Sequence, residues 1–244
     1  MSVLHLLGAA ASNLAQPRVC AGCSAPVDEP LCQACWDVVE PAPEPVRPIS
    51  APPGFPVTVA AGPYVGLVRD LLLAHKERGR ADLARPLGAL LAAAVADLLD
   101  DPSAAVALVP VPSQRSSTRR RGHDAVLRMA RMAARTLGEG ASVAPVLRHR
   151  RRVEDQSRLT LTQRRDNLAD ALVAAPVPGA LRPGMLVVVD DVCSSGATLA
   201  AARSALLSGR WPPDVVRAAV VASPPRRTGR TQDHVPVTRP IPGD

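Results

Sequence analysis

Residues 186–198, LVVVDDVCSSGAT, join a short apolar run to two adjacent carboxylates and a loop of small residues. The apolar run is rich in β-branched side chains, which favours a buried strand, and residues 198–207 continue with helical character. In open parallel sheets, ligands bind at the carboxyl ends of strands, where loops lead into helices. The segment therefore predicts a strand, an acidic strand end, a binding loop and a helix, in that order.

The rest of the chain alternates in the same way between apolar runs and stretches of helical periodicity. Strands are expected at 57–61, 105–112, 142–147, 186–190 and 215–222, and helices at 64–75, 82–99, 124–137, 160–170 and 198–207. This alternation favours a mostly parallel sheet flanked by helices, and 244 residues, 47% of them hydrophobic, can bury such a core. The expected fold class is α/β with a small N-terminal module.

Composition divides the chain into four expected segments. Residues 1–45 hold an N-terminal helix and a cysteine-containing module, and 46–56 form a proline-rich linker. Residues 57–224 form the α/β domain, and 225–244 a disordered basic tail. The early stretch VLHLLGAAA is too short for a membrane span and lacks the basic region of a signal peptide, so a cytoplasmic location is expected.

Two CxxC pairs in the N-terminal module, Cys20 with Cys23 and Cys32 with Cys35, are spaced as metal ligands. Each pair can present two thiolates from one tight turn, and four thiolates suit tetrahedral Zn²⁺. The alternative, a pair of disulfides, needs an oxidising compartment, and no signal peptide points to one. Because four protein ligands leave no position for water, the expected zinc ion is structural.

Positive charge is concentrated in residues 115–165, which carry fourteen arginines and four acidic residues, while the whole chain has a net charge of +7. Such a field suits an anionic partner, either a phosphorylated metabolite or a nucleic acid, although a solvated arginine-rich surface is the alternative. The chain has only four aromatic residues, which argues against extensive stacking of nucleic-acid bases.

The segment VVVDDVCSSGAT resembles the phosphoribosyl pyrophosphate (PRPP) binding motif of type I phosphoribosyltransferases. With the CxxC pairs, AHKERGR, VPVPS, RRGHDA and the spaced Gln156, Arg165 and Asn167, the chain from about 15 to 222 resembles the ComF family. That family joins a double zinc ribbon to a type I phosphoribosyltransferase-like domain and is associated with DNA uptake in bacterial competence. The resemblance implies PRPP as ligand, accompanied by Mg²⁺.

The resemblance also implies roles for the acidic pair and its loop. Asp190 and Asp191 would bind the ribose hydroxyls and stabilise the oxocarbenium-like charge that develops as pyrophosphate leaves. The alternative is an acidic pair that caps a helix. The 5′-phosphate would lie against amides and hydroxyls at a helix N-terminus. The residues assigned to it are Cys193, Ser194, Ser195, Gly196, Ala197 and Thr198.

The pyrophosphate end of the substrate needs cations and exposed amides. The residues assigned to it are Lys76, Val111, Pro112, Ser113, Arg115 and Arg121. Gln156, Arg165 and Asn167 occupy the position of the family's flexible catalytic loop, which closes over the reaction. After Gly122 the chain departs from RGFNQ, the usual sequence of the family. The contacts that the family makes with the following side chains are therefore not assigned to this chain. His123 and His149 are interpreted as surface residues.

Three functions follow as hypotheses. The first is Mg²⁺-dependent transfer of phosphoribose from PRPP to an unknown acceptor, with release of pyrophosphate. The second is a non-catalytic accessory protein of DNA uptake that binds PRPP or single-stranded DNA and contacts a helicase-like ATPase. The third is a structural adaptor organised by zinc, which leaves the acidic pair unexplained. Fold alone does not decide between them.

Overall fold

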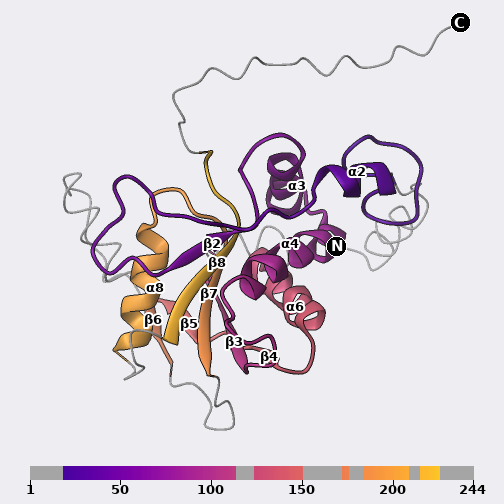
Figure 1. The fold of residues 1–244 in the computed structure, drawn as a ribbon. Coiled ribbons are helices and arrows are strands. Elements are labelled where there is room, and N and C mark those ends of the chain that lie inside the picture. Colours follow the sequence, from indigo (N-terminus) through magenta and orange to yellow (C-terminus); the bar gives the residue numbers. More distant parts are fainter. Residues whose placement is uncertain (1–18, 114–123, 151–171, 176–183, 209–214, 226–244) are drawn as a thin grey trace, which may run out of the picture.

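The computed structural model describes residues 19–113, 124–150, 172–175, 184–208 and 215–225. A six-stranded sheet lies at the centre of this part of the chain (Figure 1). From edge to edge its strands are β1 (Glu44–Pro45), β2 (Thr58–Ala60), β8 (Val216–Ala222), β7 (Met185–Val192), β3 (Val106–Pro110) and β4 (Ala141–Val143). All neighbours are parallel except β1 and β2, which are antiparallel. The prediction of an α/β fold with a mostly parallel sheet is confirmed.

Helices cover both faces of the sheet (Figure 1). One face carries α3 (Gly66–Glu77), α4 (Ala84–Ala96) and α6 (Ala125–Leu137), with the short turn η1 (Ala81–Leu83) between α3 and α4. The other carries α8 (Ala197–Leu207) and a two-stranded antiparallel sheet of β5 (Leu147–His149) and β6 (Leu172–Ala174). In the described ranges, no helix combines the length and apolar composition that crossing a bilayer requires.

The helices in the described residues begin and end within a few residues of the predicted ranges, because their apolar faces set the helical period. The strand expected at 142–147 differs. It divides into β4, which ends at Val143, and β5, which begins at Leu147. Ala144 still donates to Leu108 O at 2.8 Å, but Pro145 lacks an N–H and ends the sheet pairing. The helix expected at 160–170 and nearly all of the C-terminal tail lie outside the described residues.

The order of strands reverses between β3 and β7. The chain passes from β3 through α6 to β4 on one side, and from β7 through α8 to β8 on the other. Pro110 pairs with Val189, so the carboxyl ends of the two strands lie next to each other. Crevices at such switch points are where open α/β sheets bind ligands. The topology therefore brings the loop after residue 110 beside the acidic end of β7.

Candidate functional site

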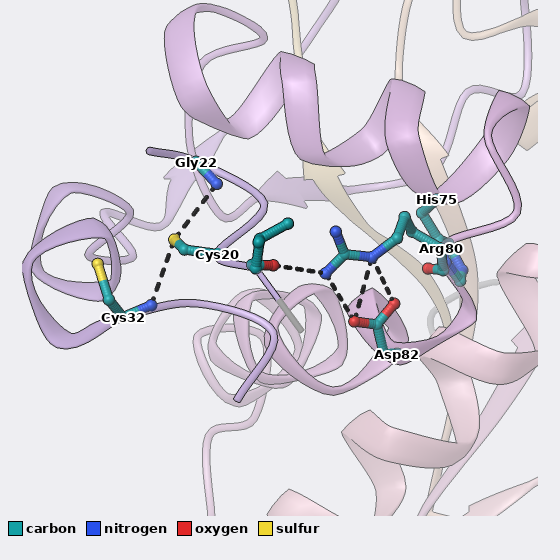
Figure 2. Close-up of polar contacts among 7 residues, drawn as sticks. Cys20, Gly22, Cys32, His75, Arg80 and Asp82 are labelled. Carbon is teal, nitrogen blue, oxygen red and sulfur yellow. Dashed lines mark hydrogen bonds and ion pairs between the residues drawn. The ribbon is translucent and has the colours of Figure 1, made fainter. Parts of the chain in front are cut away.

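The four cysteines of the N-terminal module come together as one cluster. Cys20 and Cys23 lie in a turn, while Cys32 and Cys35 lie at and just inside the start of α2 (Gln33–Val38). Their four Sγ atoms all lie within 4.8 Å of one another. The Cys20 sulfur accepts backbone N–H groups from Gly22 at 3.4 Å and Cys32 at 3.3 Å (Figure 2). The cysteines are therefore positioned to hold one metal ion.

The ionisation of these thiols fits a cation at the centre of the cluster. Burial raises the pKa of Cys20, but the N–H groups that its sulfur accepts outweigh this and lower it to about 6. Burial and the neighbouring sulfurs raise the pKa of Cys35 well above its usual range. Neighbouring thiolates thus oppose each other's ionisation unless a positive ion compensates them. A tetrahedral Zn²⁺ bound to four sulfurs would do so.

The cysteine module is attached to the α3 face of the domain. A Cβ atom on Gly22 would lie 2.7 Å from Cys35 Sγ and 3.1 Å from Leu67 Cδ1 of α3, so a glycine is required at this contact. Arg80, just after α3, donates to Val19 O at 3.4 Å and forms a two-pronged ion pair with Asp82 (Figure 2). The module and the C-terminal end of α3 are therefore held together.

The two carboxylates at the end of β7 lie close enough to interact with each other. Val187 and Val189 pack on the α3 and α4 side, and Leu186 and Val188 on the α8 side. Past Val189 this simple alternation does not continue, because Val192 packs on the first side and Cys193 on the second. The Asp191 N–H donates to Asp190 Oδ1 at 2.8 Å. The two carboxylates are therefore neighbours, and the charge of Lys76 acts on both.

Asp191 is buried and forms an ion pair with Lys76 in the last turn of α3. Its side chain is only 6% exposed, against 39% for that of Lys76. A carboxylate this deep needs a cation to offset its loss of hydration. Lys76, expected to bind pyrophosphate, lies in this structure against the acidic pair.

His75, the residue before Lys76, fixes the same end of α3. Its Nδ1 lies 2.9 Å from Arg80 O and its Nε2 lies 3.3 Å from Ala125 O, at the first residue of α6. The ring is 1% exposed. Two helices and the turn after α3 therefore meet at this imidazole, directly beside the cation that neutralises Asp191.

Asp190 is half-buried, and its environment favours the protonated form. Removal from water raises its pKa well above the usual range, and the negative charge of Asp191 adds to the effect. Burial, together with the charge of Asp190, also raises the pKa of Cys193 to about 11. The Cys193 N–H donates to Ala222 O at 3.0 Å, so any phosphate contact in this loop falls to its neighbours.

The loop that follows β7 begins α8 through a left-handed glycine. Ser194 and Ser195 are exposed, and Gly196 has a φ of +76° at the N-cap of the helix. A Cβ atom on Gly196 would lie under 3 Å from the ring of Phe55. The Arg47 guanidinium lies 6.0 Å from the centre of that ring. The proline-rich segment, expected to be a linker, thus packs across this loop, and Arg203 of α8 donates to Gly54 O at 3.5 Å.

The loop after β3 uses all its backbone donors up to residue 113. Val111 N–H donates to Val189 O at 2.9 Å, Pro112 has none, and Ser113 N–H donates to Asp124 Oδ2 at 3.1 Å. Asp124 also accepts the Ser113 hydroxyl and the Leu127 N–H, which caps α6. The exposed amides expected in residues 111–113 are therefore already paired within the protein, and an anion here would depend on side chains.

The structure brings Lys76, Asp190, Asp191, Val111, Pro112, Ser113 and the loop 193–198 to one edge of the sheet. Arg115, Arg121, Gln156, Arg165 and Asn167 lie outside the described residues. Sequence reasoning missed Asp124 as the residue that holds Ser113, although its position before a helical run is typical of an N-cap. It also missed Phe55, because no local pattern pairs residue 55 with residue 196.

No family model matches the chain, and a comparison with curated proteins found no match either.

We predict that the protein purifies with about one zinc ion per chain. Replacing Cys32 with Ser should bring the zinc content well below one and lower the Tm, because the remaining thiolates would repel one another without the ion. The measurement is metal analysis with thermal unfolding. The control is Cys193→Ala, which removes a thiol outside the cluster and should keep the zinc. Equal zinc in the Cys32→Ser protein would contradict the prediction.

We also predict that Asp190→Asn raises the Tm at pH 7. The folded chain holds the Asp190 proton more tightly than the unfolded chain, so ionisation lowers the stability as pH rises above about 4, the carboxyl value in unfolded chains. The amide removes this penalty, and its advantage should vanish towards pH 3. Thermal unfolding across pH tests this, with the exposed Asp97→Asn as control. A lower Tm at pH 7 would overturn it.

Proposed function

We propose that the protein binds PRPP with Mg²⁺ and transfers its phosphoribosyl group to an acceptor, releasing pyrophosphate. The resemblance of the sequence to type I phosphoribosyltransferases, and to the ComF family in particular, supports this assignment. The observation that carries it is the arrangement at the switch point, where β7 ends in two acids and a glycine loop beside the carboxyl end of β3.

We assign different tasks to the two acids. Asp191 is already neutralised by Lys76, so it holds the strand end and α3 in place. Asp190 is the more exposed member of the pair, so a ribose whose phosphate sits on Ser194–Thr198 would meet this carboxylate first. The raised pKa of Asp190 suits a group whose charge becomes stable only when a hydroxyl donor or a developing positive charge arrives.

Magnesium would enter with the substrate. Among the described residues, the cysteines form the one cluster of three or more potential metal ligands, so the acidic pair supplies at most part of a Mg²⁺ shell. The remaining ligands would be substrate oxygens and water, as is usual for this ion. When bound, Mg²⁺ supplies positive charge to the departing pyrophosphate. The Asp190 side chain would hold the ribose while the C1–oxygen bond breaks and the bond to the acceptor forms.

The binding test compares the wild type with Asp190→Asn by calorimetry, using PRPP and Mg²⁺. We expect the wild type to bind and the variant to bind at least about tenfold more weakly, because a charge-assisted hydrogen bond to ribose is lost. Asp97→Asn, at an exposed acid after α4, should bind as the wild type does. No heat with the wild type, or equal affinity in the Asp190 variant, would refute the proposal. Pyrophosphate release with a panel of bases and amines would then identify the acceptor.

A second function, accessory binding of single-stranded DNA during uptake together with a helicase-like ATPase, is supported by charge and by the ComF resemblance. Arg148 and Arg150 are exposed beside β5, inside the arginine-rich window. Contacts between arginine side chains and DNA phosphates weaken steeply as the salt concentration rises. We predict, for this function, that Arg148→Ala with Arg150→Ala reduces gel-shift affinity and the salt slope. Unchanged binding would count against it.

A further inference from the structure

The loop after β3 lies at the place that the proposed function gives to pyrophosphate, yet its amides up to residue 113 are already donated inside the protein. Pyrophosphate is multiply charged, and its charge increases as the bond to C1 breaks. Residues 111–113, the part of the loop that the structure describes, offer no free amide, so pyrophosphate bound against them would be met by cationic side chains.

His149 is the basic side chain that, among the described residues, makes a hydrogen bond to this loop, while the acidic Asp124 accepts from Ser113. It ends β5, and its Nε2 lies 2.9 Å from Pro112 O. Because a carbonyl oxygen only accepts, Nε2 must carry the proton and donate it. Nδ1 is the ring nitrogen that this bond does not use, and His149 is exposed at the surface of the molecule. The imidazole is thus oriented by the loop.

The position of His149 is fixed from both sides. Leu147, two residues earlier on the same face of β5, is buried in the core cluster that contains Val111. His149 pairs with Leu172 of β6, and β6 packs against α8. Arg148 projects from the opposite face of β5. The ring is therefore held next to Pro112 by packed strands.

We propose that His149 is a binding residue for the pyrophosphate group, and that its Nδ1–H donates to a pyrophosphate oxygen while Nε2–H remains on Pro112 O. This inference rests on the proposed function, since it assigns a partner to the leaving group of that reaction. An imidazolium with both nitrogens donating adds one positive charge where the paired amides of the loop supply none. The residue was interpreted from sequence as a surface histidine, because nothing in the sequence brings it to residue 112.

The experiment uses the full chain and two separate probes, Mg²⁺-pyrophosphate and ribose 5-phosphate, each followed by calorimetry. His149→Gln keeps an N–H that can donate to Pro112 O but removes the second donor and the charge. We expect this variant to bind Mg²⁺-pyrophosphate about 10- to 100-fold more weakly, the range for a lost charged hydrogen bond, and ribose 5-phosphate within about twofold of the wild type. Arg69→Gln, which removes an exposed charge from α3, should bind both probes as the wild type does.

A spectroscopic readout separates binding from a purely structural role. In ¹⁵N-histidine-labelled protein, the His149 Nδ1 signal, assigned by its loss in His149→Gln, should move to the range of a protonated nitrogen when Mg²⁺-pyrophosphate is added. An unmoved signal, or equal pyrophosphate affinity in His149→Gln and the wild type, would overturn the inference. If the wild type binds both probes and His149→Gln binds Mg²⁺-pyrophosphate equally well, the role of His149 is refuted while the proposed function stands. If the wild type binds neither probe, both fail.

Discussion

The ion pair between Lys76 and Asp191 is the interaction on which the arrangement at the strand ends depends. It joins the last turn of α3 to β7, across the face of the sheet that carries most of the core. A buried carboxylate strongly destabilises the fold unless a cation lies beside it. Because that cation, Lys76, lies in the last turn of α3, the position of this turn is constrained by Asp191. His75 and Arg80 hold this end against α6 and the cysteine module. The cysteine cluster and a strand end far apart in the sequence thereby share one support.

This arrangement explains how two adjacent acids can differ in character. One is paired with a lysine and kept as part of the scaffold. Its neighbour Asp190 feels the same lysine less strongly, and burial together with the charge of Asp191 raises its pKa. Environments that separate two like groups in this way are typical of sites where one group must respond to a ligand. Under the proposed function, the same pair would serve both stability and recognition.

Much of the fold was predictable because it rests on local patterns. The run LVVV gave a strand, the glycine after two serines gave a helix start, and the cysteine spacing gave a cluster, each from the chemistry of a few neighbouring residues. What the sequence did not reveal depends on contacts over long separations. The ion pair between Lys76 and Asp191 was not expected, because no local pattern links residue 76 to residue 191. The position of His149 depends on two strands that pair with nothing in the main sheet.

The contact between Phe55 and Gly196 bears on how relatives of this chain can vary. A side chain at position 196 would be strained by the left-handed backbone and would also collide with the ring, so neither residue can enlarge alone. A family of such sequences should therefore show covariation between these two positions, with bulk at 196 accompanied by a small residue at 55. The segment that precedes the first parallel strand would then evolve together with the turn that begins α8, even though 140 intervening residues separate them.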